Sequence, residues 1–95
     1  MIDNFNNFKK VYFAGIGGIG ISAVARLMIT EGKEVWGSDM AASTVTGELE
    51  KIGVKFQTGQ NVDQIPRDTD LVIYSIALDE LDPTFMAAMK EKFPN

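Results

Sequence analysis

A glycine-rich run at residues 15–20, Gly-Ile-Gly-Gly-Ile-Gly, constrains the fold of this chain more than any other feature. It directly follows residues 10–14, whose β-branched and aromatic side chains predict a short buried strand. It directly precedes residues 21–28, which contain no helix breaker and predict a helix. A strand, a glycine turn and a helix in this order are the setting in which GxGxxG indicates a loop that binds phosphate.

Each glycine of the GxGxxG pattern has its own expected role. Gly15 is expected to permit the tight turn, Gly17 to let the backbone approach a diphosphate, and Gly20 to let the helix pack closely on the strand. The N–H groups at the start of the helix lack helical partners, and the helix dipole favours an anion beside them. The alternative is a purely structural turn that packs helix on strand and binds no ligand.

The rest of the chain alternates segments typical of strands with segments typical of helices. We expect helices over 18–31, 44–52 and 83–92, and further strands over 34–38, 54–56 and 71–74. Four consecutive apolar residues at 71–74 indicate a strand buried on both faces. This order predicts an α/β fold, a Rossmann-like three-layer domain with a mostly parallel sheet of about four to five strands.

Residues at the helix ends support these limits. Gly32 and Gly53 are placed to end the first two helices, and Ser43 or Thr44 to cap the second. Asp82 is expected to cap the last helix, with proline in its first turn. The helix limits therefore follow from local sequence.

Several residues that suggest a site are better explained by packing or solvation. Trp36 and Tyr74 lie inside predicted strands, so we expect them in the core rather than stacked on a base. Methionines at helical spacing are expected to fill the core or an interface, namely Met28, Met86 and Met89. Asp79, Glu80 and Asp82 are expected to form a solvated loop and a helix cap, not a metal site.

Composition excludes several classes of function. A net charge of −4 without a lysine or arginine cluster argues against nucleic acid as a partner, and no apolar run is long enough for a membrane span. The chain has no cysteine and no secretory signal pattern, so we expect a cytoplasmic location. It also has no histidine, the commonest general base. We therefore expect no catalytic residue and no metal site in these 95 residues.

A second group of candidate residues follows the later strands. Asp39 ends the second strand about twenty residues after the glycine run, where an acidic residue accepts hydrogen bonds from ribose hydroxyls. Ser75 is suited to bond a ribose or phosphate oxygen, and Ala77 is small enough to admit a sugar. Because the carboxyl ends of parallel strands meet at one edge, these residues are expected to lie near the glycine run. Alternatively, Asp39 opens a turn or caps a helix, and Ser75 satisfies a strand end.

Residues 11–25, together with Gly37-Ser38-Asp39 and residues 71–77, resemble the N-terminal domain of the Mur ligase family. The resemblance implies that residues 1–95 are a Rossmann-like domain that binds the UDP part of UDP-N-acetylmuramic acid. It implies that the diphosphate contacts Gly15, Ile16, Gly17, Gly18, Ile19 and Gly20. It implies that uridine and ribose contact Ser38, Asp39, Ser75, Ile76 and Ala77.

The resemblance also implies an activity that needs more than this chain. Members of the family use ATP and Mg to form an amide bond in peptidoglycan precursor synthesis, and the matching branch adds L-alanine. The ATP-binding central domain and the C-terminal domain of that parent enzyme are expected as partners outside residues 1–95. The chain is therefore expected to be a fragment that binds substrate, holds no cofactor of its own and does not catalyse the reaction alone.

Two departures from the family pattern leave contacts open. Gln60 stands where the family often has histidine, and residues 74–78 differ from the usual Ser-Ser-Ala-Ile. The related murein tripeptide recycling ligase shares the N-terminal pattern and remains an alternative. An NAD-binding Rossmann domain of a dehydrogenase or regulatory protein, and an interaction module with structural glycines, remain open as well.

Overall fold

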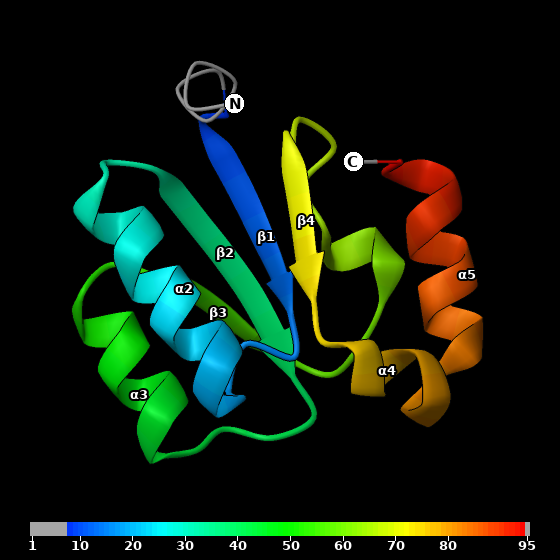
Figure 1. Ribbon diagram of the computed structural model, residues 1–95, viewed down its shortest axis with the longest axis horizontal. Coiled ribbons are helices and arrows are strands. Elements are labelled where there is room, and N and C mark those ends of the chain that lie inside the picture. Colours follow the sequence, from blue (N-terminus) through cyan, green and yellow to red (C-terminus); the bar gives the residue numbers. More distant parts are fainter. Residues whose placement is uncertain (1–7, 95) are drawn as a thin grey trace.

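Four parallel strands form the centre of the fold. The computed structural model describes residues 8–94, except for the side chains of Ile76, Asp79 and Glu80. Its strands are β1 (Lys10–Ala14), β2 (Glu34–Asp39), β3 (Lys55–Thr58) and β4 (Leu71–Tyr74). They pair in the order β3-β2-β1-β4, so β1 is central although it comes first in the chain (Figure 1).

Helices lie on both faces of this sheet. They are α2 (Ile19–Thr30), α3 (Thr44–Lys51), α4 (Ile76–Leu81) and α5 (Pro83–Lys92), with a 3-10 turn, η1 (Val62–Gln64), between β3 and β4. Helices α2 and α3 lie side by side beside β2 and β3, whereas α4 and α5 lie beyond β4 (Figure 1). The predicted Rossmann-like α/β fold is confirmed, with four parallel strands in the described residues.

The alternating side chains of β1 divide the core in two. Val11 and Phe13 pack with residues of α2 and α3, whereas Tyr12 and Ala14 pack with residues of α5. This division follows from the period of two along a strand, which directs successive side chains to opposite faces. The predicted core methionines are confirmed, because Met28 is buried in the first cluster and Met86 and Met89 are buried in the second.

The helix ends follow the capping residues of the sequence. Ser43 and Thr46 form a capping box at the start of α3. The Asp82 side chain accepts a hydrogen bond from the N–H of Phe85 at 3.1 Å and caps α5. Gly32 and Gly53 lie just past α2 and α3 and have positive φ angles, +83° and +115°, which favour glycine.

Two expectations about the second half of the chain are wrong. Strand β4 is not buried on both faces, because it lies at an edge of the described sheet and, of its residues, Val72 alone is buried. The segment after β4, expected to hold Asp79 and Glu80 in a solvated loop, is not a loop there. It forms the short helix α4, whose first turn is capped by the Ser75 hydroxyl accepting a hydrogen bond from the N–H of Ala77 at 3.2 Å.

The close helix packing expected at Gly20 occurs elsewhere. A Cβ atom at Gly20 would meet no atom within 4 Å, so this glycine is not required for packing α2 on the sheet. A Cβ atom at Gly37 would lie 2.5 Å from Cδ1 of Ile16 and 3.1 Å from the carbonyl oxygen of Phe13. The residue that needs to lack a side chain for packing is therefore in β2, opposite the glycine run.

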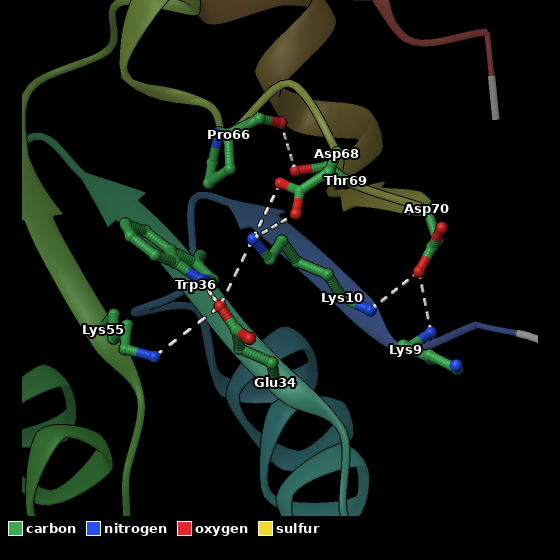
Figure 2. Close-up of polar contacts among 9 residues, drawn as sticks. All are labelled: Lys9, Lys10, Glu34, Trp36, Lys55, Pro66, Asp68, Thr69 and Asp70. Carbon is green, nitrogen blue, oxygen red and sulfur yellow. Dashed lines mark hydrogen bonds and ion pairs between the residues drawn. The ribbon is translucent and has the colours of Figure 1, made fainter.

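Trp36 is half-buried at an open part of β2 rather than fully inside the core. Its indole N–H donates to Glu34 at 2.6 Å, and the ammonium groups of Lys10 and Lys55 lie 5.7 and 5.4 Å from the ring centroid (Figure 2). Tyr74, the other aromatic residue expected in the core, is also half-buried. The indole and its charged neighbours cover part of the sheet.

Polar contacts connect the segment before β4 to the start of β1. They lie at the amino ends of the strands, and the glycine run lies at the carboxyl ends. The Asp70 carboxylate accepts hydrogen bonds from the N–H groups of Lys9 and Lys10 at 2.8 and 2.9 Å (Figure 2). These two bonds hold the pKa of Asp70 below its usual value. The Lys10 ammonium donates to Asp68 at 2.7 Å, which raises the pKa of Lys10.

Candidate functional site

A pocket of about 390 Å³ lies where the carboxyl ends of β1 and β4 meet. Residues from the glycine run, the end of β2 and the segment after β4 line it, including Gly15, Gly18, Asp39, Gln60, Ser75 and Ala77. The chain leaves β1 toward β2 on one side and reaches β4 on the other, so the pocket lies at a switch point in strand order. Ligands of open α/β sheets bind at such points.

The first part of the glycine run is held by the end of β2. Gly15 has a φ angle of +81° and makes the tight turn, as predicted. The N–H groups of Gly15 and Ile16 both donate to the carbonyl oxygen of Ser38 at 2.9 Å. The N–H of Gly17 donates to Oδ2 of Asp39 at 2.7 Å, and that of Gly18 donates to the Gly15 carbonyl at 3.2 Å. Four successive N–H groups of the run therefore have acceptors inside the protein.

The next three N–H groups are open to a ligand. Helix α2 begins at Ile19, and its first helical hydrogen bond runs from the N–H of Ser22 to the carbonyl of Gly18. In the part of the chain that the structure describes, the N–H groups of Ile19, Gly20 and Ile21 have no protein acceptor. Together with the helix dipole they form a site suited to an anionic group such as phosphate.

Asp39 lies at the junction of the pocket and the glycine run. Its Oδ2 accepts from Gly17, and its Oδ1 accepts from the N–H of Met40 at 2.8 Å. Its carbonyl oxygen accepts from the N–H of Gly59 at 2.7 Å, which ties the turn after β3 to the same place. The carboxylate lines the pocket, and both of its oxygens have partners in the protein.

Other residues of the predicted site lie at different depths. The Ser38 side chain is 0% exposed and accepts a 2.6 Å hydrogen bond from the hydroxyl of Tyr12, and the Ile16 side chain is also fully buried. Burial raises the pKa of Tyr12, so its phenol stays protonated and donates to Ser38. Ser75 and Ala77 line the pocket, whereas the side chain of Ile76 lies outside the described part of the chain. Their contacts with a ligand stay predictions.

The apolar rim of this site was not predicted from the sequence. Met40 and Leu81 line the pocket and are 70% and 80% exposed, and Ile19, at the start of α2, is 90% exposed. Exposed apolar side chains that gather around one pocket mark a ligand or interaction surface, whereas single scattered ones are normal. In the sequence, such residues are recognisable only as apolar residues next to a turn or a helix start. This pattern is too common to predict a binding site.

The described residues offer binding groups more clearly than groups for bond-making chemistry. Among the side chains that the structure describes, which do not include those of Asp79 and Glu80, no group of three or more acidic residues could hold a metal ion. None of the helices within residues 8–94 has the length and apolarity needed to cross a lipid bilayer. The site consists of backbone N–H donors, the carboxylates of Asp39 and Asp82, and a partly apolar pocket.

The parallel strand order, the glycine turn and the pocket at the switch point define a Rossmann-like α/β domain. Comparison with known families places it more closely. The family described as Mur ligase family, catalytic domain, matches residues 10–95. This chain belongs to the Mur ligase family, which confirms the resemblance seen in the sequence.

Relatives with assigned names support this placement. A UDP-N-acetylmuramate--L-alanine ligase of Acetivibrio thermocellus is 40% identical over 89 residues, which are 94% of this chain and 19% of that protein. A protein of the same name from Campylobacter jejuni is 48% identical over 80 residues, 84% of this chain and 18% of that protein. The chain thus spans about a fifth of the length of these relatives.

Solved structures show the same fold. The UDP-N-acetylmuramate-alanine ligase of Thermotoga maritima matches with a TM-score of 0.74 and 36% identity, over 87% of this chain and 19% of that chain. A murein peptide ligase of Psychrobacter arcticus matches with a TM-score of 0.67 and 22% identity, over 85% of this chain and 18% of that chain. At that identity the second match supports the fold alone.

Proposed function

We propose that this chain binds the UDP part of UDP-N-acetylmuramic acid for a cytoplasmic, ATP-dependent ligase that adds L-alanine during peptidoglycan precursor synthesis. The observation that carries the proposal is the open set of N–H groups at Ile19, Gly20 and Ile21, beside a switch-point pocket. A diphosphate matches these donors because they are backbone groups at a helix N-terminus. Membership of the Mur ligase family supports a UDP-sugar as the ligand.

The proposed ligand extends from α2 across the ends of the strands. Its diphosphate lies at the start of α2, on the turn made by residues 15–20. Its ribose and uracil lie in the pocket beside Asp39, Gln60 and residues 75–77, between the exposed side chains of Met40 and Leu81. In this arrangement Ser38 and Ile16 support the glycine turn. The carbonyl of Ser38 accepts two of its N–H groups, and the Ile16 side chain is buried in the core.

The remaining parts of the reaction are proposed to come from outside this chain. ATP, Mg and the amino acid would be bound by the central and C-terminal domains of a longer protein, whose relatives are about five times the length of this chain. L-Alanine is favoured over a tripeptide because the two relatives at 40% and 48% identity are both named as alanine ligases. The murein peptide ligase shares the fold at 22% identity.

Titration of the 95-residue chain with UDP-N-acetylmuramic acid, UDP and NAD tests the proposal. Amide NMR shifts report weak binding, and we expect saturable shifts at Ile19, Gly20 and Ile21 with both uridine nucleotides. UDP-N-acetylmuramic acid is expected to bind at least tenfold more tightly than NAD, about 1.4 kcal/mol. Tighter binding of NAD would favour the dinucleotide alternative, and absence of binding by every diphosphate would favour an interaction module.

A further inference from the structure

We propose that Asp39 is a positioning residue that fixes the glycine run through the N–H of Gly17, so that the N–H groups of Ile19, Gly20 and Ile21 face the diphosphate. This inference rests on the proposed function, because it concerns the same pocket. It differs from the ribose-binding role that the sequence suggests, because the carboxylate acts here on the protein backbone. Asp39 then affects the affinity for the ligand through the backbone conformation of the glycine run.

The first support is the pattern of hydrogen bonds along the run. The end of β2 binds three consecutive N–H groups, those of Gly15 and Ile16 through the Ser38 carbonyl and that of Gly17 through the Asp39 carboxylate. The Asp39 bond, at 2.7 Å, is the last of these before α2 begins. A charge-assisted bond of this length is stronger than a neutral one and fixes the direction in which the helix starts.

The second support is steric. A Cβ atom at Gly17 would lie 2.6 Å from Oδ2 of Asp39 and 3.4 Å from Cγ2 of Thr46. Gly17 has no positive φ angle, so its backbone conformation alone does not require glycine. Position 17 needs glycine because the carboxylate occupies the place of a side chain. The second glycine of the pattern thus serves the contact with Asp39.

The third support concerns charge. A carboxylate beside an anion site repels a diphosphate, so charge alone would make Asp39 unfavourable for this ligand. Its two oxygens are already used by the N–H groups of Gly17 and Met40. Positioning gives the carboxylate a role that offsets this repulsion. The two effects have opposite signs, which makes them separable by experiment.

The test compares UDP with uridine, which lacks the diphosphate, on the 95-residue chain and on Asp39→Asn, by amide NMR titration. An amide oxygen can accept at only one of the two positions that the carboxylate oxygens serve. We expect the UDP dissociation constant to rise about tenfold, as for loss of one charge-assisted bond, and that of uridine to change less than twofold. Glu48→Gln, which removes a charge at an exposed ion pair with Arg26, is the matched control and should change neither.

Two results would overturn the positioning role. An equal loss for UDP and uridine would show that Asp39 contacts the ribose, and tighter UDP binding would show that only its charge matters. If the unaltered chain binds no UDP, the proposed function itself fails. These outcomes are distinct, because the first two require the unaltered chain to bind UDP.

Gly17→Ala provides a second route to the same contact. Its methyl group would displace the Asp39 carboxylate, so we expect the same selective loss of UDP affinity and no further loss in the double variant. The amide proton of Gly17 adds a readout without ligand. It is expected to move upfield in Asp39→Ala, which removes both acceptor oxygens, and an unchanged Gly17 signal in that variant would contradict the contact itself.

Discussion

Two consecutive residues at the end of β2 hold the glycine run by different groups. Ser38 uses its backbone carbonyl, which any residue could supply, whereas Asp39 uses its side chain. The Ser38 side chain has a separate role, because its hydroxyl accepts a hydrogen bond from the buried Tyr12 hydroxyl in the core. A substitution at position 39 is therefore expected to disturb the run, and one at position 38 to disturb the core.

Gly37 is expected to tolerate no side chain. In Gly37→Ala the new methyl group would lie 2.5 Å from Cδ1 of Ile16 and 3.1 Å from the Phe13 carbonyl oxygen. Overpacking of this kind lowers the free energy of unfolding by about 1–3 kcal/mol. Urea denaturation measures the change. Gly47→Ala, where the methyl group meets no atom within 4 Å, is the control and should not lower stability.

Asp70 is expected to make stability depend on pH in the acidic range. Its pKa is lowered in the folded protein because the ionised carboxylate accepts hydrogen bonds from the backbone N–H groups of Lys10 and Lys9. A lowered pKa stabilises the fold above the unfolded value of about 3.9, and the contribution is lost as the pH falls through the folded pKa. Asp70→Asn should therefore be less stable than the unaltered chain at neutral pH and differ less at about pH 3.

Urea denaturation at the two pH values measures this difference. Asp63→Asn serves as the control, because Asp63 is exposed and pairs with Lys92 at the surface. Surface ion pairs contribute about 0–1 kcal/mol, so this control is expected to have little effect. A constant difference between Asp70→Asn and the unaltered chain at all pH values would contradict the role of the ionised carboxylate.

At the scale of elements, α3 depends on Ser43, the residue that caps its N-terminus. The Ser43 hydroxyl accepts from the N–H of Thr46 at 3.2 Å, and the Thr46 hydroxyl accepts from the N–H of Ser43 at 2.8 Å. Ser43→Ala removes the first of these bonds and should lower the free energy of unfolding by about 1 kcal/mol. Ser43→Asp keeps an acceptor and should retain stability. Equal losses in the two variants by urea denaturation would show that the cap does not act through its oxygen.

Most elements were predictable because their signals are local. The apolar strands, the glycines after α2 and α3, and the Asp82 cap of α5 are all defined by residues within a few positions of one another. Helix α4 was not, because six residues are too few to show a helical period. The exposure of β4 could not be predicted either, because it depends on which strands pair with β4 rather than on the apolar residues within it.

The candidate site was predictable in place but not in detail. The motif and the rule for parallel sheets predicted that the glycine run, Asp39 and residues 75–77 lie together at the carboxyl ends of the strands, and the structure has a pocket of about 390 Å³ there. The direction of the Asp39 carboxylate and the burial of Ser38 depend on contacts between residues more than twenty positions apart. No local pattern in the sequence records such contacts, so they required the folded chain.

At the scale of the whole molecule, the charge distribution predicts how salt affects binding. Among the described residues that line the pocket, none is lysine or arginine, and Asp39 and Asp82 are acidic. The chain carries a net charge of −4, so screening by salt weakens repulsion of an anionic ligand rather than an attraction. UDP affinity should therefore not fall between about 50 and 200 mM sodium chloride in the titration. A steep loss would indicate that a basic side chain holds the diphosphate.

The central position of β1 has a consequence for how the chain acquires its fold. Val11 of β1 pairs with Val35 of β2 and also with Leu71 of β4, about sixty residues further on. Of the four described strands, β1 therefore emerges first during synthesis, and one of its edges stays unpaired until β4 has been made. Such distant pairing slows folding, because the intervening loop loses entropy before the contact forms. The strand that supports the site is thus the earliest to be exposed and among the last to be enclosed.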